Sequence, residues 1–110
     1  MEKYYFEGQE VLVLKENYIV DEFLAIKIFD INYNKQIACV TRFLRGKMLD
    51  RHKYDHAYVD IYSNPLIEDF IKSNDLGYFT GYSVIVDDKV YPEYKFYVNQ
   101  LSYSPKEVRR

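Results

Sequence analysis

The stretch SNPLIEDFIKSNDLGYFTG, residues 63–81, decides the fold because it specifies a helix with a start and an end. Asn64 is a favourable N-cap, and Pro65 fits the first helical position, where its missing N–H is not needed. Glu68 and Asp69 follow near the positive end of the helix dipole, where carboxylates are stabilising. The pattern predicts a short helix that starts directly after Asn64.

This helix has one apolar stripe, formed by Leu66, Ile67, Phe70 and Ile71. Burying such side chains contributes about 1.5 to 3 kcal/mol each, before the entropy of ordering the helix is subtracted. A helix of about two to three turns is not stable alone in water, so the stripe must pack on a larger surface. We expect Gly77 to end the helix in the left-handed conformation, and the helix to cover one face of a sheet.

The other apolar segments have the β-branched and aromatic composition of strands. They predict a hairpin around Gly8, a central strand in residues 21–31, a strand in 36–44 after a polar turn, a strand in 56–62, and two strands around Asp87 and Asp88. Pro92 cannot donate to a ladder, so the last strand should have a sheet edge or a bulge there. The sequence therefore predicts an α+β fold: an antiparallel sheet of about five to seven strands with one short helix packed on a face.

Length and composition fit one domain. The chain has 110 residues, of which 48% are hydrophobic, enough for one continuous core. We predict a single α+β domain over residues 1–100 and a polar, basic C-terminal tail over residues 101–110. No apolar run reaches the roughly 18 to 20 residues of a membrane helix, and the N-terminus does not have the basic-then-apolar order of a signal peptide. These patterns predict a cytoplasmic protein.

Charge is distributed unevenly along the chain, although 15 basic and 17 acidic side chains give a net charge of only -2. Residues 42–54 contain five basic side chains and one aspartate, whereas residues 55–93 contain eight acidic side chains and two lysines. The small net charge argues against a protein that coats DNA without specificity. Either patch could still bind a charged partner, or be an ordinary solvated face.

No motif in the sequence indicates catalysis or cofactor binding. The chain contains no G-x-S-x-G, no Gly-rich phosphate loop and no H-E-x-x-H motif. His52 and His56 have the spacing of a helical metal pair, but their segment is predicted to run from a loop into a strand. Cys39 lies in a predicted strand, where the role of a small buried hydrophobic residue is expected. We therefore predict no enzymatic activity, no cofactor and no metal.

Two stretches resemble a family of proteins. AYVDIYSNPLIEDFIKSNDLGYFTG, residues 57–81, and VYPEYKF, residues 90–96, resemble an uncharacterised family of small proteins encoded on plasmids, conjugative elements and phages of gut bacteria. The similar features are the Asn-Pro helix start, the Asn-x-Leu-Gly stop and the closing Tyr-Pro-x-Tyr-x-Phe strand, and the similarity covers residues 17–98. The resemblance implies a mobile-element context, in which small acidic domains without cofactors often antagonise host defence by binding, as anti-CRISPR proteins do.

Two hypotheses for the function follow. In the first, the protein inhibits a host defence system by binding a protein encoded by the host or the element, such as a nucleic-acid-processing enzyme, through an acidic surface that imitates nucleic acid. The residues of this surface are Asp60, Glu68, Asp69, Asp75, Asp87 and Asp88. In the alternative, the protein binds nucleic acid, with stacking on nearby tyrosines. Its phosphate contacts are Arg42, Arg45, Lys47, Arg51 and Lys53. An edge strand could also pair with a second copy, so the oligomeric state stays open.

Overall fold

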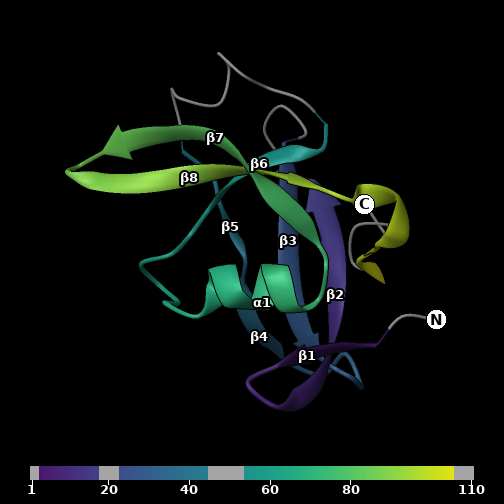
Figure 1. Cartoon of the computed structure of the whole chain (residues 1–110). Helices are drawn as coiled ribbons and strands as arrows, with labels where there is room; N and C mark the ends of the chain where they lie inside the picture. The colour runs from purple at the N-terminus through teal and green to yellow at the C-terminus, as the bar shows by residue number, and fades with distance from the viewer. Residues whose placement is uncertain (1–2, 18–22, 45–53, 106–110) are drawn as a thin grey trace.

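Two sheets and one α-helix make up the described part of the fold (Figure 1). The computed structural model describes residues 3–17, 23–44 and 54–105. Within these ranges, nine strands form a five-stranded and a four-stranded sheet. The predicted α+β class is confirmed. The strands divide into two sheets instead of forming one sheet of about five to seven, because the chain turns a corner at Val40 and passes from one sheet to the other.

The first sheet has the strand order β1-β2-β3-β4, with antiparallel neighbours along this path. Its strands are β1 (Tyr4–Phe6), β2 (Gln9–Asn17), β3 (Leu24–Asp30) and β4 (Gln36–Cys39), and β9 (Ser102–Tyr103) joins β2 in parallel. The β1–β2 turn has positive φ at Glu7 and Gly8, the conformation of a two-residue hairpin turn. The predicted hairpin at Gly8 and the predicted central strand, β3, are confirmed.

The second sheet has the strand order β5-β6-β8-β7 and is antiparallel throughout. Its strands are β5 (Thr41–Arg42), β6 (His56–Val59), β7 (Gly77–Val86) and β8 (Lys89–Phe96). Asp87 and Asp88 form the turn between β7 and β8, and both have positive φ. The predicted pair of strands around these two residues is therefore confirmed.

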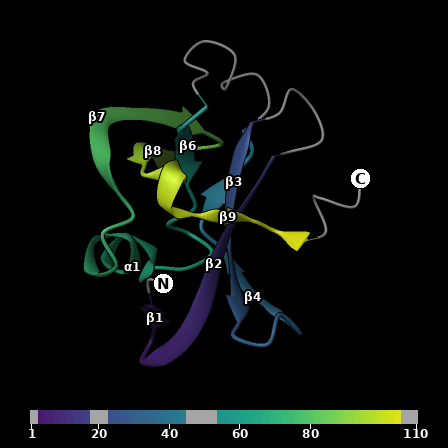
Figure 2. The ribbon, with the colours of Figure 1, turned by 90° about the vertical axis from the view of Figure 1, so that its right-hand side faces the viewer.

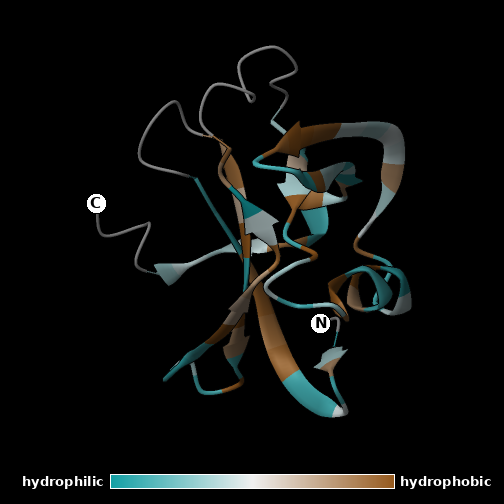
Figure 3. Ribbon diagram, turned by 90° about the vertical axis from the view of Figure 1, so that its left-hand side faces the viewer, coloured by the Kyte–Doolittle hydropathy of each residue, from teal (hydrophilic) through white to brown (hydrophobic). Residues whose placement is uncertain are grey.

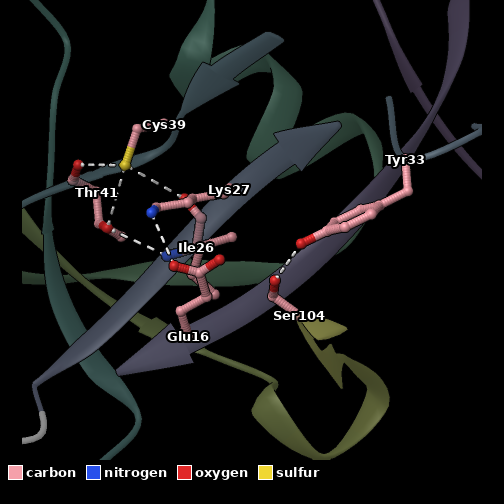
Figure 4. Close-up of polar contacts among 7 residues, drawn as sticks. All are labelled: Glu16, Ile26, Lys27, Tyr33, Cys39, Thr41 and Ser104. Carbon is pink, nitrogen blue, oxygen red and sulfur yellow. Dashed lines mark hydrogen bonds and ion pairs between the residues drawn. The ribbon is translucent and has the colours of Figure 1, made fainter. Parts of the chain in front are cut away.

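Val40 joins the two sheets. Its N–H donates to the Ile26 carbonyl in β3 at 2.8 Å, and its own carbonyl accepts from the Asp60 N–H, after β6, at 3.0 Å. Thr41 Oγ1 accepts a hydrogen bond from the Ile26 N–H at 3.2 Å, and Cys39 Sγ donates to the Thr41 carbonyl at 3.1 Å (Figure 4). The corner is thus held by backbone and side-chain hydrogen bonds from both sheets.

Helix α1 (Ile67–Ser73) confirms the predicted helix but begins later than predicted. Leu66 occupies the N-cap position, and Asn64 instead forms the preceding turn, with its Oδ1 accepting from the Leu66 N–H at 3.2 Å. Pro65 therefore lies outside the helix. The predicted stripe is buried except for Leu66, which is 48% exposed because it precedes the first turn.

The helix ends in a left-handed residue, but this residue is Asp75 (φ 52°) and not Gly77. The Leu76 N–H donates to the Ile71 carbonyl at 3.0 Å, the hydrogen bond of a Schellman motif. Gly77 is needed for a different reason, since a Cβ there would lie 2.2 Å from the Lys95 carbonyl oxygen of β8. The predicted left-handed glycine is wrong, because aspartate also tolerates this conformation and leaves the glycine free to serve strand packing.

The main core lies between the two sheets and the helix. Figures 1 and 2 show α1 on the same side of the first sheet as the β7–β8 hairpin and below that hairpin. The buried cluster draws side chains from each layer, including Ile26 of β3, Val59 of β6, Ile71 of α1 and Phe96 of β8. The helix therefore packs where the two sheets meet.

The C-terminal segment belongs to the fold as far as Ser104. The 3-10 helix η2 (Val98–Gln100) leads into β9. Buried Ser104 donates its N–H to the Lys15 carbonyl at 3.0 Å, and its hydroxyl lies 2.7 Å from the Tyr33 hydroxyl (Figure 4). Residues 101–104, which the prediction assigned to the C-terminal tail of residues 101–110, thus pack against the fold. The residues after 105 lie outside the described ranges.

Candidate protein-binding surface

The β7–β8 hairpin projects from the rest of the fold (Figure 1). It carries several exposed apolar side chains. Near its tip, Ile85 and Val90 are partners on neighbouring strands, and their side chains are 66% and 43% exposed. Farther along β7, Tyr78, Phe79 and Tyr82 are also exposed. Exposed apolar side chains on a projecting hairpin make it a candidate surface for binding a partner.

Strand β7 is an outer strand of the second sheet within the described residues. Its ten residues, GYFTGYSVIV, contain no charged side chain and no proline. Natural edge strands usually carry charges or proline, which prevent pairing with another chain. Because β7 has neither form of protection, its edge can accept another strand.

β7 bends in its middle. Its pairing with β8 shifts register between Phe79 and Ser83, and Gly81, within this interval, has a φ of +94°. Figures 2 and 3 show the resulting arc of the strand. Pro92 pairs with Ser83 directly beside the shift, so the bulge predicted near Pro92 is confirmed.

A buried carboxyl group lies opposite this bend. Glu93 of β8 is only 2% exposed, and Thr80 Oγ1 donates to Glu93 Oε1 at 2.8 Å. The Thr80 hydroxyl also accepts a hydrogen bond from the Tyr82 N–H at 3.3 Å. Glu93 is one of the eight acids of residues 55–93, but its burial was not predicted, since nothing near it in sequence identifies its partner.

Tyr62 supports the outer half of the hairpin, beyond the end of β6. Its hydroxyl accepts a hydrogen bond from the Val90 N–H at 2.9 Å, and its ring lies 5.5 Å from the ring of Tyr91. Lys89 Nζ lies 5.6 Å from the centre of the Tyr62 ring. Tyr62 therefore covers the edge of β8 that faces away from β7.

A hydrogen bond ties helix α1 to the hairpin. The Tyr94 hydroxyl donates to Glu68 Oε2 at 2.5 Å. Burial raises the pKa of the Tyr94 hydroxyl, and the hydrogen bond to Glu68 and the charge of Glu68 raise it further. Glu68, a member of the predicted acidic surface, is thus a contact between helix and sheet.

Asp60 and Arg42, which sequence analysis assigned to opposite patches, form an ion pair with a distance of 3.7 Å. Asp60 is 7% exposed and also accepts a hydrogen bond from the Ser63 N–H at 3.1 Å, so its carboxylate serves the fold. The Arg42 guanidinium also lies 5.7 Å from the centre of the Tyr91 ring. The other residues of the predicted basic patch lie outside the described ranges: Arg45, Lys47, Arg51 and Lys53.

The remaining predicted acids are exposed, but they do not form one patch. Asp69 lies on α1, and Asp75 lies between the end of α1 and the start of β7. Asp87 and Asp88 occupy the hairpin turn, after the end of β7. The exposed acids therefore form two groups, one at each end of the uncharged outer strand.

A second polar cluster joins β6 to β8. Buried Asp55 has its Oδ1 2.7 Å from His56 Nδ1 and its Oδ2 3.9 Å from Lys95 Nζ. The cluster borders an open pocket of about 410 Å³. The sequence places Asp55 beside His56, but it gave no signal for Lys95. In the parts of the chain that the structure describes, no group of three His, Cys, Asp or Glu side chains could hold a metal ion, and His52 lies outside them.

None of the helices in the described ranges has both the length and the apolar character needed to cross a membrane. Comparison of the chain with protein-family models, with curated proteins and with solved structures finds no match. The function of the hairpin surface must therefore be inferred from its own chemistry.

Proposed function

We propose that this protein acts by binding another protein through the β7–β8 hairpin. The observation that supports this function is an uncharged outer strand with exposed Tyr78, Phe79 and Ile85 and with exposed acids at both of its ends. Aromatic and aliphatic side chains supply the buried centre of many protein interfaces, and charges around them select the partner. Such a contact needs no catalytic group, so the proposed function is binding without catalysis and without a cofactor.

We further propose that the partner is a component of a bacterial host defence system, encountered in the cytoplasm. This narrower proposal is supported by the resemblance to proteins of mobile elements and by the acids that are exposed. A nuclease of such a system binds nucleic acid through a basic channel, and carboxylates on a rigid surface can occupy that channel. The residues proposed for this contact are Asp69, Asp75, Asp87 and Asp88.

Nucleic-acid binding is the alternative function. Arg42 belongs to the predicted basic patch, but its guanidinium is already engaged by Asp60 and by the Tyr91 ring. The alternative requires affinity for single-stranded oligonucleotides that falls steeply with salt. Labelled oligonucleotides that do not bind at low salt would eliminate it.

An affinity pull-down tests the proposed function. Tagged protein is incubated with nuclease-treated bacterial lysate at low and high salt, and we expect a stoichiometric protein partner. Ile85→Ser should reduce the recovery of this partner. Ile31→Ser is the matched control, since Ile31 is an equally apolar residue, 52% exposed, in the turn between β3 and β4. Absence of a partner, or equal recovery with the two variants, contradicts the proposal.

A further inference from the structure

We propose that the outer edge of β7 binds an extended segment of the partner as an additional strand, and that this segment carries basic residues on both sides of an apolar stretch. The inference rests on the proposed protein-binding function and names the chemistry of the partner segment. Addition of a strand to a free sheet edge is a general mode of peptide recognition, in which backbone hydrogen bonds supply affinity and side chains supply selectivity.

The hairpin turn determines which backbone groups of β7 face outward. In a hairpin with a two-residue turn, the residues that flank the turn exchange hydrogen bonds, and the next pair does not. Val86 and Lys89 flank the turn, so the pair of Ile85 and Val90 is of the second kind. By the same alternation, Ser83 also directs its N–H and C=O groups away from β8.

Two observations on β8 agree with this alternation. The Val90 N–H points away from β7, because it donates to the Tyr62 hydroxyl at 2.9 Å. Pro92, the partner of Ser83, has no N–H that β7 could use. Ser83 and Ile85 therefore present two N–H donors and two carbonyl acceptors along the outer edge, at the spacing that a partner strand requires.

Acidic side chains lie at both ends of this edge. Exposed Asp69 and Asp75 precede the strand, and Lys72 lies between them in sequence. Exposed Asp87 and Asp88 follow the strand. The lysines of β8 are engaged on the other side of the hairpin. Lys89 lies over the Tyr62 ring, and Lys95 lies 3.9 Å from Asp55. A basic residue on either side of a bound segment would therefore meet carboxylates.

The same charges disfavour a second copy of this chain as the occupant. Antiparallel pairing of two β7 strands along their full length brings Asp75 of one copy toward Asp87 and Asp88 of the other. Parallel pairing brings identical acidic ends together. Both arrangements oppose like charges, whereas a segment flanked by lysine or arginine is attracted in either direction.

A synthetic peptide tests the inference on the full chain. The probe is a fluorescently labelled peptide of alternating valine and threonine with two lysines at each end, and the matched control has two glutamates at each end. We expect fluorescence anisotropy to show saturable binding of the lysine peptide, about tenfold tighter than binding of the glutamate peptide. Added salt should reduce this difference, because exposed charges are screened.

Substitutions at Ser83 test the site of binding. Ser83→Pro removes an outward N–H without removing a hydrogen bond to β8, and proline is tolerated at such edge positions. We expect this variant to bind the lysine peptide about tenfold more weakly, whereas Ser83→Thr, which keeps the N–H, should bind within about twofold of the original protein. Ile85→Lys, at an exposed side chain, should also weaken binding of the lysine peptide. Thermal unfolding of each variant checks that it is folded.

The outcomes separate this inference from the proposed function. Equal binding of the two peptides overturns the charge requirement, and equal binding by Ser83→Pro and Ser83→Thr overturns the edge as the site. No binding of the lysine peptide at low salt overturns the whole inference, as does self-association of the free protein that Ser83→Pro abolishes. If the partner in the pull-down is lost with Ile85→Ser but retained with Ser83→Pro, the binding function stands and the added strand does not. If no partner is captured, the proposed function fails.

Discussion

Gly77 shows how one residue can be required by space instead of by backbone conformation. Gly77→Ala should lower the free energy of unfolding by about 2 to 3 kcal/mol, because the added Cβ would lie 2.2 Å from the Lys95 carbonyl oxygen and force β7 and β8 apart. Ser83→Ala, at an exposed position of the same strand, should change it by less than about 0.5 kcal/mol. Denaturant unfolding measures both values, and similar losses in the two variants would contradict this explanation.

Tyr94 links stability to alkaline pH. Its pKa is raised above the ordinary value of 10.0 by burial and by Glu68, so the folded protein keeps a proton that the unfolded chain loses. The resulting stabilisation is fully present below pH 10.0 and decreases as the pH rises above this value. We expect Tyr94→Phe to reduce the alkaline fall in the free energy of unfolding, measured with denaturant at a series of pH values. Tyr5→Phe, at an exposed tyrosine, should keep the fall of the original protein, and an unchanged slope in Tyr94→Phe would refute the assignment.

Sequence reasoning at this scale found acidic residues but not their partners. In the sequence, Asp60, Glu68 and Asp87 each directly follow an apolar residue. The structure engages the first two through Arg42 and Tyr94, both distant along the chain, and leaves the third exposed. Which acid is available to a partner depends on contacts between strands and helix, and such contacts leave no local pattern.

At the scale of elements, a substitution at the C-terminal end of helix α1 can increase the stability of the fold. Asp75 holds a left-handed conformation that glycine adopts without a steric cost. Asp75→Gly should therefore raise the free energy of unfolding by about 0.5 to 1 kcal/mol, as thermal or denaturant unfolding can show. Asp75→Ala should lower it by about 1 kcal/mol, since alanine tolerates this conformation poorly. The opposite order of the two variants would contradict the role of Asp75 as the helix end.

The hairpins were predictable because their signals are local. Polar turn residues between apolar runs identified the turns at Gly8 and at Asp87 and Asp88. The helix was predictable from its apolar stripe, but its ends were not, because Asn64 and Gly77 suit more than one role. The position of β7 as an outer strand among the described residues was not predicted, although its lack of charge is visible in the sequence, since strand order depends on long-range pairing.

At the scale of the whole molecule, the division into two sheets depends on the corner at Val40. The run QIACVTRFL, residues 36–44, has an unbroken strand composition, so nothing in it marks the change of sheet. The corner is made by hydrogen bonds to β3 and to the residue after β6. Sequence reasoning therefore recovered the α+β class and most of the strands, but it could not assign them to separate sheets.

Thr41 tests the importance of this corner for the whole fold. Its Oγ1 accepts a hydrogen bond from the Ile26 N–H in a buried position. Thr41→Val keeps the shape of the side chain but removes the acceptor, and we expect it to lower the free energy of unfolding by about 1 to 3 kcal/mol. Thr41→Ser retains the hydroxyl and should cost less. A Thr41→Val variant as stable as Thr41→Ser would show that this hydrogen bond does not hold the sheets together.

The parallel pairing of β9 with β2 also orders events during synthesis of the chain. A ribosome makes Leu14 long before its partner Ser102. Ser102 is made only after all the other described strands of both sheets. Until then, the edge of β2 that pairs with β9 is open in the nascent protein, and the Lys15 carbonyl lacks its hydrogen bond from the Ser104 N–H. The first sheet can therefore close only after residue 104 has left the exit tunnel, so a stalled nascent chain would present an unfinished sheet to chaperones and proteases.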